Sequence, residues 1–243
     1  MFVPNKRAFR AFRENKVALV GLFMVVVLLL VAIFADLIIP YDVREQDVLA
    51  RYAEPGAEHW LGTDDFGRDV FSRIVMGSRV SLFVGVVSVA IAMLTGSWLG
   101  IIAGYRGGKT DGAVSWIVDT LMAFPSLLLG LMVVSALGPG LENTIVAISL
   151  AFVPRFARVA RGPTIVLKEN EFILAAKAAG ASQSRIIFRH ILPNLVGELV
   201  VMGSLWVSTA IIIESSLSFL GLGVQPPTPS WGVMIKQGGA QIL

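Results

Sequence analysis

The segment EFILAAKAAGASQSRIIFRHILPN, residues 171–194, is the most informative part of the chain because it places a polar helix-break-helix pattern between two long apolar stretches. A helix is predicted from Glu171, and Gly180 provides its C-terminal stop. Ser182 is a suitable N-cap for a second helix, which is expected to end two residues before Pro193. The pattern predicts a compact corner to which a soluble partner can bind. A solvated loop with helical propensity is the simpler alternative.

The rest of the chain is too apolar for a soluble domain of its length, with 55% hydrophobic residues, 15% charged residues and a mean hydropathy of +0.76. Uncharged runs cover residues 17–35, 80–105 and 120–141. Each is near the roughly 20 residues that a membrane-spanning helix needs. Two further spans are predicted over residues 143–160 and 195–222. We therefore predict an all-α, polytopic membrane bundle with five spans.

The distribution of lysine and arginine predicts the orientation, since cytoplasmic flanks and short loops collect positive charge. Most of the 20 basic residues lie on one side of the membrane if the N-terminus is cytoplasmic. Residues 1–16 are then a basic amphipathic segment on the inner leaflet, and residues 17–243 form a single transmembrane domain. Within it, residues 40–79 form an acidic external loop and residues 162–194 a cytoplasmic loop. This orientation accounts for the net charge of +3 without nucleic-acid binding.

Apolar residues near the end of the external loop, at Phe66, Phe71 and Ile74, have helical spacing and predict a short amphipathic helix before the second span. The chain contains no cysteine, which excludes disulfides and cysteine-ligated metals. His59 and His190 lie on opposite predicted sides of the membrane and cannot hold a metal together. No constellation of nucleophile and base is found. The sequence therefore predicts neither a metal site nor a catalytic site.

Two motifs with charged residues suggest other functions at first sight. Residues 103–110, AGYRGGKT, fit a relaxed phosphate-loop pattern, but such a loop follows a β-strand, whereas this segment lies between two predicted spans. A tight turn is the simpler prediction. Arg155, Arg158 and Arg161 recur at every third position, as in a voltage sensor. Because they adjoin the polar segment, we expect them to reach toward lipid phosphates instead.

Carboxylates inside predicted spans are informative, because a charge in hydrocarbon is costly unless it is paired or faces water. Glu214 lies well inside the fifth span, beside Ser215 and Ser218. It either lines a pathway or holds a partner helix by hydrogen bonding, and the sequence does not separate these roles. Asp119 is expected to cap a helix or to pair with a neighbouring residue, and Pro125 is expected to kink the same span.

The segment after the fifth span, residues 225–231 or QPPTPSW, cannot form a regular helix and is expected to lie on the external surface. Trp231 is suited to the membrane interface. Glu214 through Trp231 therefore approaches the external end of the bundle.

The polar segment contains a set of residues that resembles a known motif, Ala175-Ala176, Gly180 and Leu192-Pro193. These residues are similar to the EAA loop of ABC-importer permeases, with Leu174 in place of the glutamate of the motif and His190 in place of its isoleucine. The whole string over residues 175–194 resembles the oligopeptide, dipeptide and nickel importer branch of that family. The resemblance extends to FRENKVALVGL (12–22), LGTDDFGRDVFSRIVMGSRVSL (61–82), DTLMAFPSLLL (119–129) and ESSLSFLGLGVQPPTPSWGVM (214–234).

The resemblance implies a type I importer permease fold with a sixth span, so the chain is expected to end before its last helix. It also implies that the chain is no enzyme, holds no cofactor, and forms half of a pathway for peptides or a related small solute. The implied location is a bacterial or archaeal inner membrane. The implied partners are a second permease, two ATP-binding subunits that hold ATP and magnesium, an external solute-binding protein and membrane lipid.

The resemblance assigns three sets of residues. The residues expected to couple to the ATP-binding subunits are Glu171, Ala175, Ala176, Ala179, Gly180, Ala181, Ser182, Arg185, Leu192 and Pro193. The candidates for an outer gate are Glu214, Ser215, Ser218 and Trp231, with a rigid packing loop as the alternative. The candidates for docking the binding protein are Asp64, Asp65 and Arg68, with a cap over the bundle as the alternative. The rival function is an ion-coupled secondary transporter or channel subunit that uses Glu214 and Asp119.

Overall fold

The computed structural model describes residues 10 and 12–242, and the regular structure in this part of the chain is helical. Thr63 and Asp69 form an isolated β-bridge. The all-α prediction is therefore confirmed for the described residues. Most of the amphipathic segment expected over residues 1–16 lies outside them.

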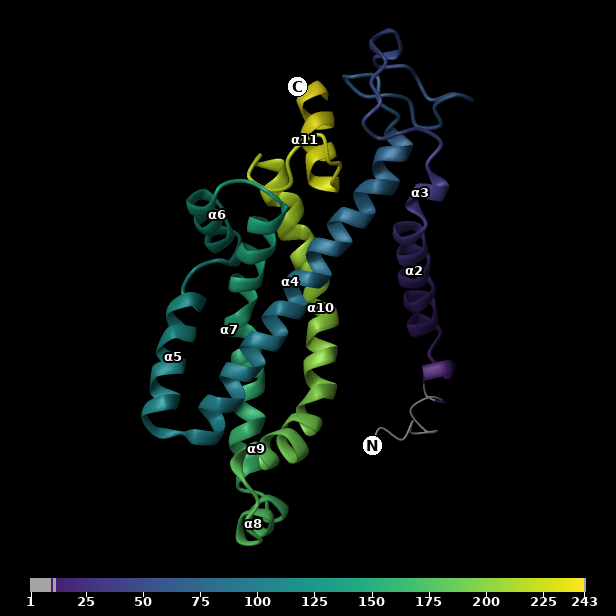
Figure 1. Cartoon of the computed structure of the whole chain (residues 1–243). Helices are drawn as coiled ribbons and strands as arrows, with labels where there is room; N and C mark the ends of the chain where they lie inside the picture. Colours follow the sequence, from purple (N-terminus) through teal and green to yellow (C-terminus); the bar gives the residue numbers. More distant parts are fainter. Residues whose placement is uncertain (1–9, 11, 243) are drawn as a thin grey trace. The chain divides into compact units, whose positions relative to one another are not determined.

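The contacts within the chain form two compact units, residues 1–80 and 81–243. The first unit begins with a helix of membrane length whose start is capped, because the side chain of Asn15 accepts a hydrogen bond from the backbone N–H of Ala18. The helices of this unit are α2 (Lys16–Ile33), α3 (Ala35–Ile38), the 3-10 turn η1 (Val48–Ala50) and the first turns of α4 (Val70–Arg106). Helix α2 corresponds to the first predicted span (Figure 1).

The C-terminal end of α2 is held by Arg79, which lies on α4 within the same unit. The guanidinium of Arg79 donates to the backbone carbonyls of Ala32 and Ile33, at 2.8 and 2.9 Å. It also donates to the carboxylate of Asp36 at 2.9 Å. A cation at the last carbonyls of a helix satisfies free acceptors and complements the helix dipole. The sequence analysis did not identify this contact.

The second predicted span is longer than expected, because α4 runs without a break from Val70 to Arg106. The separate amphipathic helix expected inside the loop of residues 40–79 does not exist. Phe71 and Ile74 belong to the first turns of α4, whereas Phe66 lies in a turn of the loop, which ends at residue 69. The physical reason is that Gly77 is the weakest helix former at the junction, and one glycine costs only about 1 kcal/mol relative to alanine.

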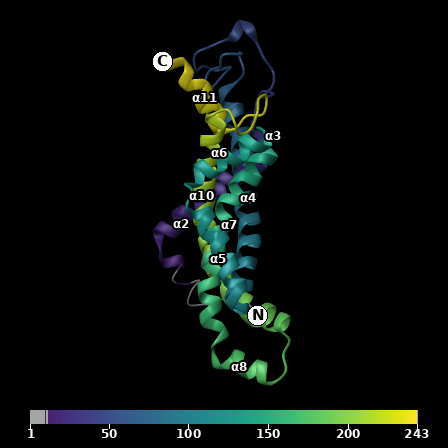
Figure 2. The same ribbon diagram turned by 90° about the vertical axis from the view of Figure 1, so that its left-hand side faces the viewer.

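The second unit is built around α7, which contacts α5, α6 and α10. Figures 1 and 2 show α8 and α9 at one end of this unit and α6 and α11 at the opposite end. Besides the continuation of α4, its elements are α5 (Gly108–Met122), α6 (Ser126–Leu137), α7 (Leu141–Lys168), α8 (Glu171–Ala178), α9 (Gln183–Ile186), the π-turn η2 (Ile187–Ile191), α10 (Leu192–Phe219) and α11 (Trp231–Ile242).

Four described helices are long and apolar enough to cross a membrane, and the pair of α5 and α6 makes a fifth if it counts as one span. These two helices are bent by 92° at a short break, so the third predicted span, residues 120–141, is not one helix. Pro125 stands at the break as the N-cap of α6. It has no N–H to continue the helix and disfavours helical backbone before it. The predicted kink at Pro125 is confirmed.

Helices α4 and α7 touch along their backbones at a stripe of glycines, Gly96, Gly100 and Gly104. A Cβ added at Gly100 would overlap the carbonyl oxygen of Ala157, and one added at Gly104 would come within 2.8 Å of the carbonyl oxygen of Arg161. Small residues at this spacing are a common device for close packing of membrane helices. Beside the stripe, buried Phe152 and Phe156 of α7 pack in the core of the second unit.

The turn between α4 and α5 is made by Gly107 and Gly108, with φ angles of +69° and +54°. Glycine is the residue that adopts this left-handed region without strain. The tight turn predicted for the AGYRGGKT segment is therefore confirmed. The segment follows a helix rather than a strand, which is not the setting of a phosphate loop.

Candidate functional site

The corner predicted within the polar segment lies between α8 and α9. Helix α8 ends before Gly180, which has a φ angle of +80°. The N–H of Ala181 donates to the carbonyl of Ala176 at 3.0 Å, the bond that closes a helix end around a left-handed glycine. The hydroxyl of Ser182 then accepts a hydrogen bond from the N–H of Arg185 at 3.4 Å. The predicted stop at Gly180 and the predicted N-cap at Ser182 are both confirmed.

The second helix of the corner does not end before Pro193, and this prediction was wrong. A helical segment runs without interruption over Gln183–Phe219. Within it, Ile187–Ile191 is a π-turn in which the N–H of Leu192 bonds to the carbonyl of Ile187. A π-turn inserts one extra residue into the helix. The chain thereby enters α10 with the proline in its first turn, where a missing N–H is tolerated.

Buried isoleucines fix the corner to the bundle, while its small residues face outward. Ile173, Ile186 and Ile191 are buried and belong to the core of the second unit. A Cβ added at Gly180 would meet no described atom within 4 Å. The small-residue side is therefore open to close approach. Among the coupling candidates, Ala176, Ala181 and Leu192 are half-buried, and the exposed ones are Glu171, Ala175, Ala179, Gly180, Ser182, Arg185 and Pro193.

Two large apolar side chains on the outer side of α8 were not among the predicted site residues. Phe172 and Leu174 are each 46% exposed. They flank the buried Ile173, and because consecutive residues on a helix point in different directions, only one of the three can face the core. The run of three apolar residues was the available signal. The outer face of the corner therefore presents apolar groups as well as alanines.

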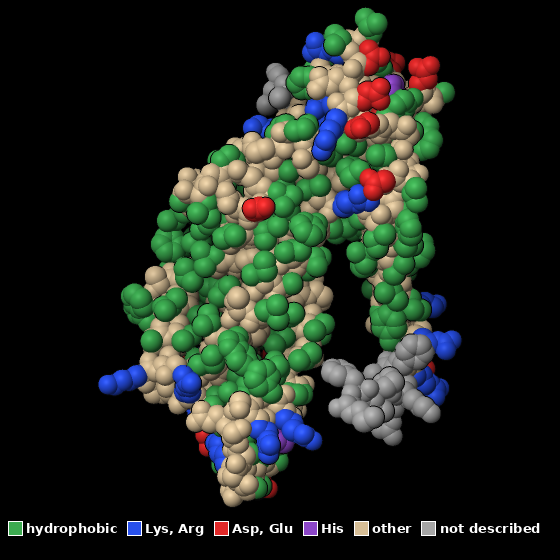
Figure 3. Space-filling view, viewed as in Figure 1, with side chains coloured by type: hydrophobic (Ala, Val, Ile, Leu, Met, Phe, Trp, Pro, Cys, Tyr) green, Lys and Arg blue, Asp and Glu red, His purple; other side chains and the backbone are tan. Residues whose placement is uncertain are grey.

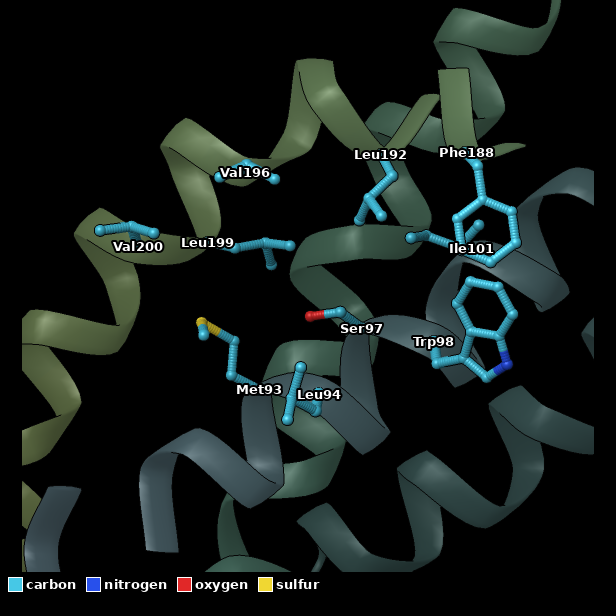
Figure 4. A pocket seen from close by; sticks show the side chains of 10 residues that line it. All are labelled: Met93, Leu94, Ser97, Trp98, Ile101, Phe188, Leu192, Val196, Leu199 and Val200. Atoms are coloured by element: carbon cyan, nitrogen blue, oxygen red, sulfur yellow. The ribbon is translucent and has the colours of Figure 1, made fainter. Parts of the chain in front are cut away.

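An apolar groove of about 470 Å³ begins beside the corner, between α4 and the η2–α10 segment. Figure 4 shows its lining, which comes from both sides. The rings of Trp98 on α4 and Phe188 on η2 lie 5.3 Å apart at one end. The hydroxyl of Ser97 points into the groove (Figure 4), and the structure gives it no hydrogen-bond partner among the described residues. The Trp98–Phe188 contact joins the corner to α4.

Glu214 is completely buried, and its carboxyl group is hydrogen-bonded to hydroxyls from two helices. Ser218, one turn further along α10, donates to Oε1 at 2.8 Å. Ser81 of α4 donates to Oε2 at 2.8 Å, and Ser215 lies 3.4 Å from the same oxygen. Buried polar groups with this many donors hold elements together. Of the two roles left open by the sequence, the geometry shows the hydrogen bonding between helices.

The same hydroxyls connect Glu214 to the segment after α10. The N–H of Trp231 donates to the hydroxyl of Ser81 at 3.3 Å, and the N–H of Val224 donates to the hydroxyl of Ser218 at 3.1 Å. The structure therefore brings together all four residues assigned to the outer gate, and it adds Ser81 to them. Of residues 225–231, which were predicted not to be helical, 225–230 are not helical, whereas Trp231 begins α11, so the prediction was wrong for that residue.

The three arginines of α7 bind neighbouring helices, a role that the expected contact with lipid phosphates did not include. Arg155 donates to the hydroxyl of Ser126 on α6 at 2.7 Å. Arg158 donates to the carboxylate of Asp119 on α5 at 2.7 Å, which confirms that Asp119 pairs with a neighbouring residue. Arg161 makes two hydrogen bonds to Asp111, at 2.5 and 2.6 Å. The three arginines face α5 and α6, because Ser126, Asp119 and Asp111 on those helices lie within hydrogen-bonding distance of them.

In the loop of the first unit, the docking candidates bind one another. Arg68 is only 3% exposed and donates to the carboxylate of Asp64 at 2.7 Å. Asp64 also lies 3.4 Å from Arg73 and accepts the backbone N–H of Phe66. Asp65 is the most exposed of the three candidates, with 28% of its side chain accessible. Asp64 and Arg68 therefore shape the loop from within.

Comparison with protein families gives two matches. The model described as "Binding-protein-dependent transport system inner membrane component" matches residues 96–242. The model described as "N-terminal TM domain of oligopeptide transport permease C" matches residues 4–55. One solved structure, titled as an inward-facing conformation of the MetNI methionine ABC transporter, covers 71% of this chain and 88% of its own chain with a TM-score of 0.56. At 21% sequence identity, this likeness supports the fold, a type I importer permease.

Curated relatives match over nearly the whole chain. The dipeptide transport system permease protein DppC of Alkalihalophilus pseudofirmus is 47% identical over 96% of this chain and 77% of its own length. The glutathione transport system permease protein GsiD of Pectobacterium atrosepticum is 42% identical, over 99% and 80% respectively. The oligopeptide transport system permease protein OppC of Bacillus subtilis is 42% identical, over 96% and 76%. These relatives do not favour the rival secondary transporter.

The family models and relatives agree with the fold. The chain is a multi-pass membrane protein and a transport subunit rather than an enzyme. It belongs to the family of binding-protein-dependent transport system inner membrane components, as an ABC-importer permease of the peptide branch.

Proposed function

We propose that this chain is one of two permeases that enclose a pathway for small peptides, dipeptides, oligopeptides or glutathione among them. Two ATP-binding subunits would hold ATP and magnesium on one side, and an external solute-binding protein would deliver the peptide on the other. The observation that carries the proposal is the corner between α8 and α9, which is anchored from within and bordered outside by alanines and glycine. The substrate class is taken from the relatives of the peptide branch.

The α8–α9 end is proposed to face the cytoplasm, with the N-terminus on the same side, in a bacterial or archaeal inner membrane. Lysine, arginine and histidine side chains gather at the α8–α9 end of the second unit, and hydrophobic side chains cover its middle (Figure 3). Positive charge accumulates on cytoplasmic flanks. Lipid headgroups would meet the basic side chains around this end.

The corner would pass the movement of the ATP-binding subunits to the bundle. Ile173 and Ile186 fix it to the core, so it cannot slide freely over the bundle. Its second half continues into α10 through the uninterrupted segment Gln183–Phe219. A displacement of the corner would therefore tilt α10, and the two outward- and inward-open states of the pathway would differ in this tilt.

At the opposite end, Glu214, Ser215, Ser218 and Trp231 are proposed to form part of the outer gate. Their hydrogen bonds join α4, α10 and the start of α11, so opening at this end would have to move these elements as a group. Asp64, Asp65 and Arg68 are proposed to shape the loop that receives the binding protein. Asp65 is the candidate most available for direct contact.

Co-purification in detergent tests the coupling surface. The chain would be expressed with its second permease and the ATP-binding subunits, as the native sequence and as Gly180→Trp. The matched control is Gly138→Trp, because Gly138 also has a positive φ angle, +93°, and no described atom within 4 Å of an added Cβ. It ends α6, at the other end of the second unit.

The expected result is recovery of the ATP-binding subunits with the native sequence and the control, and their loss with Gly180→Trp. A side chain at Gly138, with φ +93° and ψ 160°, meets at least as much backbone strain as one at Gly180, so survival of the control would assign the loss to the large side chain at the corner. Equal recovery with all three proteins would remove the corner as the docking surface. Failure of the native sequence to retain any ATP-binding subunit would overturn the proposed assembly with those subunits.

A further inference from the structure

The ion pair between Arg158 and Asp119 differs from its neighbours in its exposure. Arg161 is held to Asp111 by two hydrogen bonds, so its charge is compensated in a two-point contact. Arg158 and Asp119 share a single hydrogen bond of 2.7 Å, from Nη2 to Oδ1. Their side chains are 57% and 64% exposed. The exposed guanidinium of Arg158 and the exposed carboxylate of Asp119 can therefore donate to and accept from other groups.

The pair joins the last turn of α5 to the interior of α7. Asp119 lies three residues before Met122, where α5 ends, and Arg158 lies ten residues before Lys168, where α7 ends. A charge in contact with lipid tails costs several kcal/mol. The exposed groups of the pair are therefore expected to face water, lipid headgroups or protein.

A pocket of about 390 Å³ opens at this pair. Its floor is the contact of Gly100 with Ala157, where the backbones of α4 and α7 meet. Ser115 of α5 lies in the wall, and the polar groups of Asp119 and Arg158 are part of the lining. Small-molecule sites commonly have roughly 300–1,000 Å³ and a few convergent polar groups. The pocket therefore has the size for one or two residues of a peptide and carries charges of both signs.

We propose that this pocket is a binding site for the charged end groups of the transported peptide, a zwitterion. The free oxygen Oδ2 of Asp119 would accept from the α-ammonium group, and the unused N–H groups of Arg158 would donate to the α-carboxylate. Because opposite charges already lie side by side, neither group of the peptide would meet an uncompensated like charge. This inference rests on the proposed function, from which the peptide is taken.

The chain contains no cysteine, so a cysteine introduced in the pocket can be labelled without a background from this chain. Ser115→Cys would be placed in the complete complex of two permeases and two ATP-binding subunits, without the binding protein. The rate of alkylation by a small maleimide would be measured with millimolar alanyl-alanine, and with its N-acetylated, C-amidated derivative. Ser184→Cys, at an exposed position of α9, is the control for effects outside the pocket.

Alanyl-alanine, at roughly one to four times its dissociation constant, is expected to slow alkylation at position 115 by roughly two- to fivefold, because the rate falls in proportion to the fraction of empty sites. The capped derivative should not slow it, and neither peptide should change the rate at position 184. Adding Asp119→Asn or Arg158→Gln should abolish the protection by alanyl-alanine.

Three results would overturn the proposal: no protection, equal protection by the capped peptide, or protection that persists in both variants. Absence of alkylation at position 115 would also overturn it, because the face would then be covered by protein. None of these results would affect co-purification of the ATP-binding subunits, which tests the proposed function separately.

Discussion

A hydroxyl group has one proton, and at Glu214 the protons of Ser81 and Ser218 are both directed at the carboxyl group. Each of these hydroxyls also accepts a backbone N–H, from Trp231 and Val224. In both series of hydrogen bonds, from backbone N–H to serine hydroxyl to carboxyl oxygen, each donor therefore points toward the carboxyl group. Hydrogen bonds aligned in this way reinforce one another in a low-dielectric interior. The buried carboxyl group thus has a structural role that its position in the sequence alone does not reveal.

Glu214→Gln is predicted to destabilise the permease. A glutamine has a donor NH₂ in place of one acceptor oxygen, so one serine hydroxyl must turn away and a buried bond is lost, at about 1–3 kcal/mol. Thermal unfolding of the detergent-solubilised complex should therefore occur at a lower temperature. Glu198→Gln, at an exposed position of the same helix, is the matched control and should leave the midpoint unchanged. Slowed transport with an unchanged midpoint would show that Glu214 acts in the pathway instead.

Part of this network could be predicted from the sequence and part could not. Ser215 and Ser218 are one and four residues from Glu214, and helical periodicity places the second on the same face. Ser81 is 133 residues away and on another helix. No local pattern identifies such a partner, because the contact depends on how α4 and α10 pack.

Prolines show the same limit at the scale of a helix. Pro125 breaks the chain between α5 and α6, as predicted, whereas Pro193 is accommodated in the first turn of α10. Both remove one N–H donor, so their intrinsic effect is the same. The two prolines differ in the segment that precedes them. Before Pro193, the π-turn Ile187–Ile191 supplies an extra residue that the sequence pattern does not reveal. Local propensity therefore predicted the site of a possible break but not whether the helix would continue.

The glycine stripe of α4 determines how closely two helices can approach. Gly96, Gly100 and Gly104 are spaced by four residues and so lie on nearly one face, which the sequence shows directly. Their partner could not be predicted, because any helix with small residues would fit such a stripe. The structure identifies the partner as α7, through the carbonyl oxygens of Val153, Ala157 and Arg161.

Gly100→Ala is predicted to destabilise the bundle, although alanine is the better helix former. The new Cβ would overlap the carbonyl oxygen of Ala157, and relief requires α4 and α7 to separate. Overpacking of this kind costs about 1–3 kcal/mol. Gly112→Ala is the matched control, because it lies inside α5 with no described atom within 4 Å of the added Cβ. It should instead stabilise by about 0.5–1 kcal/mol.

Opposite signs for the two glycine variants, measured as shifts in the thermal midpoint of the same complex, would support the backbone contact. A loss of stability in both would indicate that the methyl group itself is harmful in either helix. No loss at Gly100 would mean that α4 and α7 do not touch there in the membrane.

In the second unit, two of the links between the corner and the bundle lead to α10 and to α4. One is the continuous helical segment Gln183–Phe219, which leads into α10. The other is the contact between the rings of Phe188 and Trp98, which leads to α4. Because α4 and α10 also meet at Glu214, a movement of the corner reaches the opposite end by two routes. The sequence predicted the corner but not these connections, since both depend on packing between distant segments.

Phe188→Ala is therefore predicted to weaken coupling while leaving the complex assembled. The buried isoleucines of the corner are untouched, so the ATP-binding subunits should still co-purify, but the link to α4 is removed. An aromatic pair contributes about 0.5–1.5 kcal/mol, so peptide transported per ATP hydrolysed in proteoliposomes should fall by roughly two- to tenfold. Phe219→Ala, at an exposed position near the other end of the same helical segment, is the control and should keep the native ratio. An unchanged ratio for Phe188→Ala would show that the ring contact with Trp98 is not needed for transmission.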